Sequence, residues 1–347
     1  MNDLNEILAK IEEAGLVGRG GGCFPTHKKW ARIKNIQSEK KYLVCNASEG
    51  EPGVKKDHHL LKNHCETVFQ GMIVAMDFLN TKLGYLNINS NYYEELKSII
   101  DPVVQNHNNS GYSIKIYIEE PSYIGGESGT ILNSIEGKRA EPRLKPPSPS
   151  VKGLYGFPTL IHNVETLYNV ALVHQDKFNH ARFCTVGGQV NNPGVYEVAD
   201  NLTVKQALEQ TNNWPEFPFF AHIGGNACGE FITQEQSEAQ ELCGSGSIEI
   251  YNNSTTSHQI LGTLFSFYKK ESCGKCMPCK YGSYQLVELL KENEPVPWQK
   301  IVNIAKTMNQ TSFCGLGKAI FKPISTYINN VVKNNPEYKN EVESLNI

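Results

Sequence analysis

The spacing of apolar residues changes along this chain, and it first predicts an alternation of helices and strands. Between residues 2 and 136, short apolar runs alternate with stretches in which apolar residues recur every three or four positions. Such an alternation is typical of a layered sheet whose strands are joined by crossover helices. We predict helices at 2–14, 60–79, 92–101 and 127–136, and strands at 41–45, 84–88 and 113–118.

The pattern changes beyond residue 140. Prolines in residues 141–158 restrict the backbone to an extended path, which predicts an ordered loop. Residues 185–198 alternate β-formers around Asn-Asn-Pro-Gly, which predicts a hairpin. A helix at 203–211 and strands at 219–224 and 247–251 would complete a small β-grasp-like (ubiquitin-like) unit. After Ser257 the spacing is helical and predicts a bundle with helices at 258–270, 280–292, 297–308 and 316–332.

The predicted fold class is therefore α/β with three domains: an α/β domain at 1–175, a β-grasp domain at 176–255 and a helical domain at 256–347. A chain of 347 residues is long enough for these cores. Its 39% hydrophobic and 20% charged residues are ordinary for globular proteins, and the net charge of −3 does not indicate nucleic-acid binding.

Nothing in the sequence predicts insertion into a membrane. There is no run of about eighteen apolar residues, so we expect no membrane-spanning helix. The polar and acidic start, Met1 to Glu6, argues against a signal peptide. Six cysteines are scattered, which suits a reducing cytoplasm with free thiols; they are Cys23, Cys45, Cys65, Cys184, Cys228 and Cys243.

Four further cysteines carry the strongest chemical signal. Cys273, Cys276, Cys279 and Cys314 are spaced C-x2-C-x2-C-x34-C. Three closely spaced thiolates and one distant thiolate are the ligand pattern of a [4Fe–4S] cluster, which would move electrons. Structural zinc instead prefers two separate pairs of ligands, so a zinc site is the weaker alternative.

Four polar segments are candidate ligand sites. The glycine loop at 18–22 and Gly125-Gly126 before a helix would offer backbone amides to an anion, such as a phosphate or a reduced flavin. The segment 46–53 follows a predicted strand, where α/β sheets bind ligands. The segment 159–166 places polar groups at a helix start, although His162 by itself is better explained as a structural histidine. A flexible surface loop is the alternative for the glycine loop, and a solvated acidic turn is the alternative for 46–53.

Together these segments resemble a known family in order and spacing. The chain resembles the flavoprotein, NADH-binding subunit of respiratory complex I and the related diaphorase subunits of NAD-linked hydrogenases and formate dehydrogenases. The match extends from about Gly15 to Pro323. It rests on Gly18-Arg-Gly-Gly, Phe24-Pro-Thr, Lys29-Trp30, Asn46-Ala-x-Glu-Gly-Glu-Pro-Gly53, Tyr123-Ile-x-Gly-Glu127, Leu132-Asn-Ser-x-Glu-Gly-x-Arg-Ala140, Pro142-Arg-x-Lys-Pro-Pro147, Asn163-Val-Glu-Thr166 and both cysteine segments.

The resemblance implies FMN in a Rossmann-like domain, a β-grasp domain, and a [4Fe–4S] cluster in a helical domain. It also implies that the usual N-terminal extension is missing. Gly18, Arg19, Gly20, Gly21 and Lys29 would contact FMN and its phosphate. Asn46, Glu49, Gly126 and Asn163 would line the flavin, Phe24 and Glu51 would face NAD(H), and Glu127 is counted with these cofactor-binding residues. The implied partners are a thioredoxin-fold [2Fe–2S] subunit and a larger iron–sulfur subunit, through which a cytoplasmic chain would be peripheral to a membrane.

This sequence departs from the family pattern mainly around the expected nucleotide. Arg32 and Ser148 replace aromatic residues that grip the adenine, and Ser128 replaces a second glutamate. Ser48 and His162 replace an aspartate and an asparagine, and Cys23 follows two glycines where the family has Gly-Ala-Gly. Losing two stacking contacts would weaken nucleotide binding on the order of 10²–10³-fold. Arg32 would offset part of this loss by stacking or by pairing with a phosphate.

Three hypotheses follow. The first is an NADH-dehydrogenase-type oxidoreductase subunit, in which NADH or NADPH reduces FMN and the cluster passes single electrons onward. The cofactors carry this chemistry, so no side chain is predicted to act as a catalytic acid or base. The second is an electron relay or scaffold that keeps its cluster but no longer binds nicotinamide. The third is a zinc-stabilised binding module.

Overall fold

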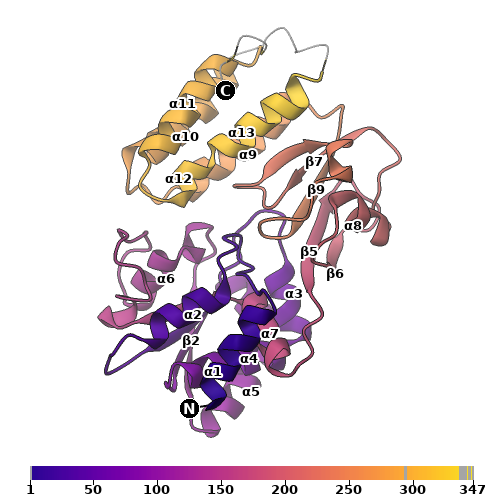
Figure 1. Cartoon of the computed structure of the whole chain (residues 1–347). Helices are drawn as coiled ribbons and strands as arrows, with labels where there is room; N and C mark the ends of the chain where they lie inside the picture. Colours follow the sequence, from indigo (N-terminus) through magenta and orange to yellow (C-terminus); the bar gives the residue numbers. More distant parts are fainter. Residues whose placement is uncertain (1, 293–294, 336–341, 343–344, 346–347) are drawn as a thin grey trace. The chain divides into compact units, whose positions relative to one another are not determined.

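The computed structural model describes residues 2–292, 295–335, 342 and 345, and it divides into two compact units (Figure 1). The first unit comprises Met1–Gly50 and Lys55–Phe183, and the second comprises Glu51–Val54 and Cys184–Ile347. The second unit therefore contains residues 184–255 of the predicted β-grasp domain and all of the predicted helical domain, whereas residues 176–183 belong to the first unit. Their separation into two domains stays a prediction.

A four-stranded parallel sheet forms the centre of the first unit. Its order is β3-β2-β1-β4, with β1 (Tyr42–Ala47), β2 (Leu83–Asn89), β3 (Ser113–Glu119) and β4 (Thr159–Asn163). The three strands predicted from apolar runs are confirmed. The fourth was missed, because the polar residues of Thr159–Asn163 concealed a strand whose first four residues are buried.

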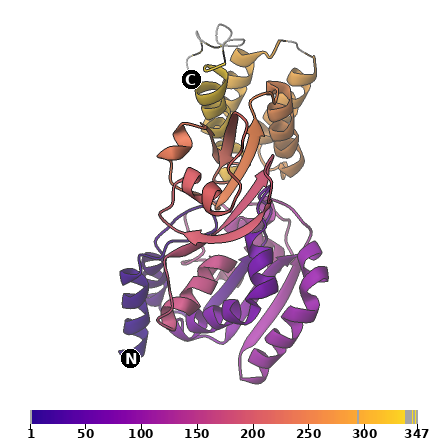
Figure 2. The ribbon, with the colours of Figure 1, turned by 90° about the vertical axis from the view of Figure 1, so that its right-hand side faces the viewer.

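Both faces of this sheet are covered, which explains why β1 reads as a continuous apolar run. On one face, Tyr42 and Val44 pack with Ile161 and with residues of α6 (Ser128–Ile135). Cys45 points to the opposite face, where burial, together with the charges of Asp57 and Cys65, raises the pKa of its thiol. Alternate residues of one strand therefore serve two layers of helices, and Figure 2 shows the ribbon from the side.

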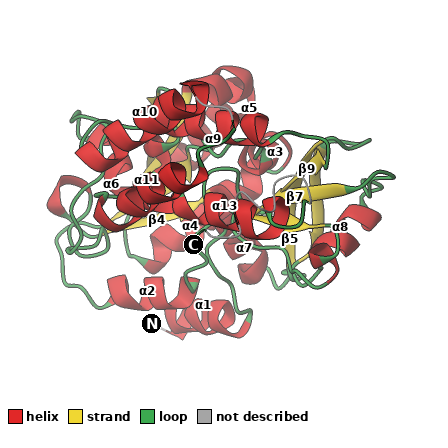
Figure 3. Ribbon diagram, turned by 90° about the horizontal axis from the view of Figure 1, so that it is seen from above, coloured by secondary structure: helices red, strands yellow, loops and turns green. Residues whose placement is uncertain are grey.

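Seven helices are described in the first unit. They are α1 (Asn2–Glu13), α2 (Thr26–Lys34), α3 (Lys56–Asn63), α4 (Cys65–Phe78), α5 (Ser90–Asn109), α6 and α7 (Val164–His174). The predicted helices at 2–14 and 127–136 are confirmed by α1 and α6. Helix α2 was not predicted, although Pro25 before it is a start signal; it lies beside α1 (Figure 3).

Two predicted helices had the wrong extent. The helix predicted at 60–79 is two helices, because His64 leaves helical geometry at φ −135° and its ring lies 5.3 Å from that of Tyr168. The helix predicted to stop at 101 continues through Pro102 to Asn109. Pro102 and Ser98 are both exposed, so water can bond the carbonyl group that the proline leaves without a donor.

A glycine sets the packing of α4 on α7. A Cβ atom at Gly71 would lie 1.8 Å from the carbonyl oxygen of Leu167, so only glycine permits this approach. Helix α7 also contributes residues to the candidate site described below. The close packing therefore fixes the position of that site's polar groups relative to the sheet.

The second unit contains a five-stranded mixed sheet in the order β6-β5-β9-β7-β8. The strands are β5 (Ala181–Gly188), β6 (Gly194–Ala199), β7 (Phe219–Ile223), β8 (Glu230–Thr233) and β9 (Ser247–Asn252). Helix α8 (Val204–Gln210) packs Val204, Ala207 and Leu208 into the core of this sheet. The predicted hairpin, helix and two strands are confirmed, whereas the short β8 was missed.

The remaining helices of the second unit are α9 (Ser257–Glu271), α10 (Met277–Glu292), α11 (Trp298–Thr311), α12 (Gly315–Ala319) and α13 (Phe321–Thr326) (Figure 1). A π-helical turn follows at Tyr327–Val332. The single helix predicted at 316–332 is thus three segments. Pro323 lacks the amide that would bond to Ala319, where α12 ends, which explains the first break. No helix in the described residues has the length and apolar character needed to cross a membrane.

Candidate functional site

The carboxyl ends of β1 and β4 lie where the strand order reverses. The chain proceeds from β1 to β2 and β3 on one side, and it returns to β4 on the other side of β1. Open α/β sheets bind ligands in the crevice at such a point. Asn46 of β1 and Asn163 of β4 are direct register partners at these ends. The fold therefore brings together two residues that the sequence placed in separate candidate segments.

The glycine loop at 18–22 lies against this edge of the sheet. The Gly18 amide donates to the carbonyl oxygen of Phe24 at 2.9 Å, and the Arg19 amide donates to Oγ1 of Thr166 at 2.9 Å. A Cβ atom at Gly20 would lie 3.2 Å from Cβ of Asn163. At Gly21 and Gly22 an added Cβ would meet nothing within 4 Å, so the loop borders open space there.

The Gly125-Gly126 segment contacts Asn46, but not in the way that the sequence predicted. The side-chain amide of Asn46 donates to the carbonyl oxygen of Gly126 at 3.0 Å. The first amides of α6 are not left for a ligand, because the Glu127 carboxylate accepts from the amides of Gly129 at 2.7 Å and Thr130 at 3.0 Å. This cap corrects the expectation that the helix start would bind an anion through free amides.

Lys29 brings a positive charge to the same region. Its Nζ donates to the carbonyl oxygen of Ile161 in β4. Burial, followed by the charge of Lys145, lowers the pKa of Lys29 to about 8. Next to it, Trp30 Nε1 donates to His162 Nε2 at 2.8 Å, and burial lowers the pKa of His162 well below its usual range. His162 is thus a neutral acceptor within the packed interior.

Sequence reasoning missed Lys56, which forms the ionic centre of this region. Its ammonium group lies 2.7 Å from Asp57 Oδ1 and 3.1 Å from Glu165 Oε2, and it donates to Asn163 Oδ1 at 3.2 Å. Burial alone would lower the pKa of Lys56, but the charges of Asp57 and Glu165 raise it. The ammonium group therefore stays charged and holds Asn163 in place. A Lys-Asp pair in a polar turn gives no sequence signal of burial.

The two predicted glutamates of segment 46–53 have different surroundings. Glu49 accepts from the amides of Asp57 at 3.0 Å and His58 at 3.3 Å, and from the Tyr92 hydroxyl at 3.1 Å. Burial and the charge of Asp57 raise the pKa of Glu49 to about 8. Glu51 belongs to the second unit, where it accepts from the Ala227 amide at 2.6 Å.

Three residues at the altered family positions, Arg32, Ser128 and Ser148, make side-chain contacts with neighbouring residues. The guanidinium of Arg32 lies over the ring of Phe24, which is 45% exposed. Ser128 donates to Glu127 at 3.1 Å, and Ser148 bonds to Ser150 at 2.9 Å. The first unit therefore presents one exposed aromatic ring and one arginine where the family pattern has three aromatic residues.

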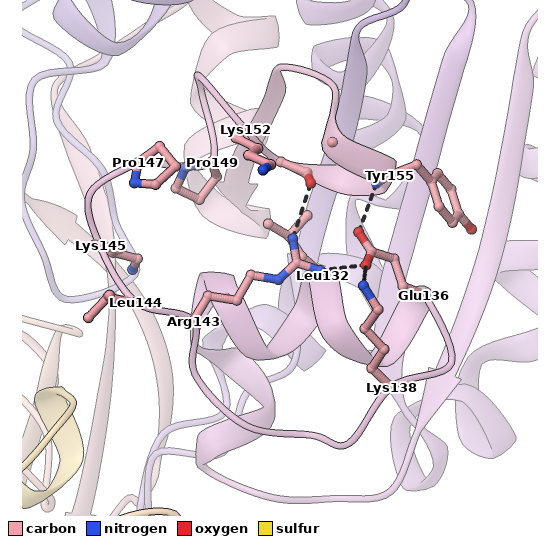
Figure 4. Close-up of a pocket in the computed structure, with 13 residues that line it drawn as sticks. Leu132, Glu136, Lys138, Arg143, Leu144, Lys145, Pro147, Pro149, Lys152 and Tyr155 are labelled. Atoms are coloured by element: carbon pink, nitrogen blue, oxygen red, sulfur yellow. Dashed lines mark hydrogen bonds and ion pairs between the residues drawn. The ribbon is translucent and has the colours of Figure 1, made fainter.

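A basic cavity of about 570 Å³ lies between α6 and the proline-rich loop (Figure 4). Lys138 and Arg143 both contact Glu136 Oε2, at 2.5 and 2.8 Å, and Arg143 also donates to the carbonyl oxygen of Gly153 at 3.1 Å. Although burial opposes it, Arg143 and Lys138 lower the pKa of Glu136. These bonds order the loop, as its prolines predicted, and Lys145 of the same loop reaches Glu127 at 2.5 Å.

The four spaced cysteines of the second unit all lie at helix junctions. Cys273 and Cys276 lie between α9 and α10, and Cys279 is in the first turn of α10. Cys314 directly precedes α12. Burial raises the pKa of the Cys279 thiol to about 11, and the charges of the other three cysteines add to this shift. Cys314 is therefore close enough to influence the Cys279 thiol, and the assignment of all four cysteines to one cluster stays a prediction.

The surroundings of these thiols fit a group with sulfide and thiolate ligands. The Phe313 amide donates to Cys276 Sγ at 3.4 Å, and amides of Leu316 and Gly317 bond to Cys314. Amide bonds to sulfur are one means by which proteins tune iron–sulfur clusters. A Cβ at Gly317 would lie 2.3 Å from Ser312 Oγ and 3.0 Å from Cys279 Cβ, so the chain passes closely behind the thiols.

All ten cysteines are free thiols in the structure. Among the described residues, no three His, Cys, Asp or Glu side chains are grouped closely enough to ligate a single metal ion.

Two family profiles match this chain. Residues 11–172 match the family described as the Nuo51 FMN-binding domain. Residues 259–335 match the family described as the NADH-ubiquinone oxidoreductase-F iron–sulfur binding region. The first match covers the glycine loop and both asparagines, and the second covers all four spaced cysteines.

Relatives and solved structures agree with these matches. The F 2 subunit of NADH-quinone oxidoreductase of Rhizobium meliloti is 30% identical, over 90% of this chain and 84% of the relative. The alpha subunit of the NAD-reducing hydrogenase HoxS of Cupriavidus necator is 29% identical, over 92% of this chain but only 58% of the relative. A crystal structure of an NAD⁺-reducing [NiFe]-hydrogenase in the H₂-reduced state superposes with a TM-score of 0.86 and 25% identity, over 95% of this chain and 62% of that chain.

Proposed function

This chain belongs to the family of the F subunits of NADH-quinone oxidoreductase, and on that premise we propose that it oxidises NADH or NADPH at FMN and passes single electrons through a [4Fe–4S] cluster to partner subunits. The observation that carries this proposal is the convergence of the glycine loop, Asn46 and Asn163 on the switch point of the sheet. The gathered cysteines of the second unit support it independently.

We assign FMN to the carboxyl edge of β1 and β4. Gly18, Arg19, Gly20 and Gly21 would border the flavin and its phosphate. The amides of Gly18 and Arg19 already bond to Phe24 and Thr166, so the donors to the flavin are assigned to Gly20 and Gly21, where open space borders Gly21. Lys29 would supply positive charge. Its pKa is lowered to about 8, so this charge is lost as the pH rises through that value. Asn46, Asn163, Gly126 and Glu49 would line the ring, and the Lys56 network would keep Asn163 oriented.

Within the first unit, the nucleotide is assigned to the side of Phe24, with Glu127 as a further contact. An exposed ring of this kind offers a stacking surface to a base. Arg32 would add charge that suits a phosphate, so both NADH and NADPH are candidates. A bound flavin would supply hydride acceptance from nicotinamide, and a bound cluster would supply one-electron transfer. The side chains position these groups, and none is assigned as an acid or base.

The finer architecture and the assembly are also proposals. The order β3-β2-β1-β4 supports a Rossmann-like domain at 1–175, and the five-stranded sheet supports a β-grasp domain at 176–255 beside the helical domain at 256–347. Several relatives are named as subunits, so we propose a thioredoxin-fold [2Fe–2S] subunit and a larger iron–sulfur subunit as partners. A cytoplasmic location, peripheral to a membrane through those partners, would follow.

Anaerobic mixing of the FMN- and cluster-loaded protein with NADH, and separately with NADPH, tests this function. We expect bleaching of the flavin absorbance with at least one nucleotide, followed by reduction of the cluster detected by EPR. No bleaching with either nucleotide would overturn the oxidation of nicotinamide and leave the relay hypothesis. Zinc without acid-labile sulfide in the purified protein would overturn the cluster and leave the zinc module.

A further inference from the structure

The cavity between α6 and the proline-rich loop has the size and the lining of a small-molecule site (Figure 4). Its volume of about 570 Å³ falls within the roughly 300–1,000 Å³ that such sites occupy. Leu132 of α6 forms an apolar wall together with Pro147 and Pro149 of the loop, and charged side chains line the remainder. Apolar walls with a few polar groups are the usual lining of a ligand pocket.

This cavity is distinct from the residues assigned to FMN and to the nicotinamide nucleotide, because neither Phe24 nor Asn163 lines it. Within the loop, Pro147 and Pro149 line the cavity, whereas Ser148 between them does not and bonds to Ser150 instead. Ser148 is the residue that stands where the family pattern has an aromatic residue for the nucleotide. That position therefore belongs to a different side of the loop from the cavity.

Positive charge is concentrated in the lining of the cavity. One carboxylate is set against four cations, which gives a formal charge of +3, whereas the net charge of the chain is −3; the charged residues are Glu136, Lys138, Arg143, Lys145 and Lys152. A concave surface with one sign of charge attracts ligands of the opposite sign. The cavity therefore favours an anion.

Neighbouring side chains do not neutralise these cations. Lys138 and Arg143 share a single oxygen atom, Oε2 of Glu136, so one carboxylate balances two cations. Lys152 is exposed and makes no hydrogen bond or ion pair with any residue that the structure describes. Lys145 is already bonded to Glu127, so the argument for a ligand does not need it. Two lysine ammonium groups, those of Lys138 and Lys152, remain able to bond a ligand.

Ordering of the loop explains only one of these cations. Arg143 bonds α6 through Asn133 at 2.8 Å and the loop through the carbonyl oxygen of Gly153 at 3.1 Å. Lys138 adds a second cation to an oxygen that Arg143 already contacts, and Lys152 adds no contact to the loop. A purely structural role therefore leaves Lys138 and Lys152 without a purpose.

Tyr155 adds an aromatic ring to the lining. The residue is 50% exposed, and its backbone is held in place because its amide donates to Glu136 Oε1 at 2.8 Å. The ring also makes an edge contact with Tyr42, with 5.9 Å between the ring centroids. A half-exposed ring that is held in this way offers a stacking surface to a base.

We propose that this cavity binds a nucleoside diphosphate. Lys138 and Lys152 would donate to the phosphate oxygens, because an ammonium group has three donors and these two lysines use at most one. Arg143 would hold the loop, and the base would stack on Tyr155. A nucleotide satisfies both the excess charge and the exposed ring, whereas inorganic phosphate satisfies only the charge. The inference goes beyond the proposed function, since it involves neither hydride nor electron transfer.

Isothermal titration calorimetry of the FMN- and cluster-loaded protein with magnesium-free ADP tests this proposal. We expect saturable binding of one ADP per chain, with adenosine and pyrophosphate each binding at least about tenfold more weakly. Lys152→Glu and Tyr155→Ala should each weaken ADP binding by about tenfold. Two matched controls should bind ADP as the unaltered protein does. Tyr155→Phe keeps the ring, and Lys62→Glu makes the same charge change on an exposed residue of α3.

The Phe24→Ala variant shows whether ADP instead occupies the side assigned to the nicotinamide nucleotide. We expect it to bind ADP as the unaltered protein does; weaker binding by Phe24→Ala, with no effect of Lys152→Glu, would overturn the proposal. So would equal binding of pyrophosphate and ADP, or equal binding of adenosine and ADP. Circular dichroism reports whether each variant is folded.

If Tyr155→Ala does not fold, Lys138→Ala takes its place in the same titration, because Lys138 contacts the other carboxylate oxygen of Glu136. Equal ADP binding by Lys138→Ala, Lys152→Glu and the unaltered protein would again overturn the proposal. These titrations contain no nicotinamide and no reductant, so their failure is distinct from a failure of flavin bleaching.

Discussion

The guanidinium carbon of Arg32 lies 6.0 Å from the centroid of the Phe24 ring. Phe24 is an aromatic residue that the family pattern retains, and Arg32 stands where that pattern has another aromatic residue. The arginine therefore occupies the neighbourhood of the ring on which a nucleotide base would stack. If the nucleotide is bound as proposed, a change at Arg32 alone should alter its affinity.

Replacing Phe24 with alanine should weaken NADH binding about tenfold, because one base–aromatic contact is lost. Arg32→Phe should strengthen it by a similar factor and reduce any preference for NADPH. The dependence of flavin bleaching on nucleotide concentration measures both effects. Ile118→Ala is the matched control, because Ile118 in the same unit is 46% exposed, as Phe24 is 45% exposed. Equal affinities for Phe24→Ala and the unaltered protein would contradict the nucleotide assignment.

Removal of the buried Lys56 charge should destabilise the protein strongly. Lys56→Met would leave Asp57 and Glu165 buried without their cation, which costs about 3–5 kcal/mol in comparable sites. Urea denaturation followed by circular dichroism measures the free energy of unfolding. Lys97→Met removes an ion pair of similar length, 2.8 Å to Glu94, but on an exposed helix face, and it should leave stability unchanged. A loss of the same size in both variants would show that burial of the pair is irrelevant.

Glu49 should make stability fall as the pH rises toward 8. Its pKa is raised to about 8, so between the ordinary carboxyl range and pH 8 the folded state binds a proton that the unfolded state has released. The folded state therefore loses its advantage as the pH increases through this window. Glu49→Gln keeps the shape and removes the titration, so its stability should depend less on pH between about 5 and 8.

Denaturant titrations at several pH values test this difference, and infrared spectroscopy at pH about 6.5 should show a protonated carboxyl band that Glu49→Gln lacks. If the variant and the unaltered protein show the same pH dependence and the same carboxyl band, the assignment of the proton to Glu49 is wrong.

Two glycines beside Cys314 provide a sharp test of the cysteine site. Gly317→Ala would place a Cβ 2.3 Å from Ser312 Oγ and 3.0 Å from Cys279 Cβ, so Ser312 must shift and Cys279 is crowded. We expect a variant that retains FMN but loses most of its iron and sulfide. Gly315→Ala meets nothing within 4 Å and should keep the cluster, as judged by EPR and by iron and sulfide analysis. Full cluster content in Gly317→Ala would contradict this description of the site.

The local features of this protein could be predicted from the sequence alone. The cysteine spacing predicted an iron–sulfur region, and the family match at residues 259–335 agrees with that prediction, because the backbone keeps three cysteines of this spacing close together whatever the remainder of the fold is. Apolar periodicity likewise located β1, β2, β3 and most helices, since each of these patterns reports burial of one face or both faces of a single element. The glycine loop was visible for the same reason, because residues without a Cβ mark close backbone approaches.

Only the tertiary structure decided which polar groups share one site. Lys56 and Asn163 are 107 positions apart and in hydrogen-bond contact, yet a Lys-Asp pair in a turn reads as solvated charge. The Glu127 carboxylate caps its own helix. The amides that the two preceding glycines had suggested as an anion site are therefore already bonded. The burial and the ion pairs of a residue depend on contacts from distant segments. Whether a charged residue stabilises the protein is therefore decided only when the chain is folded.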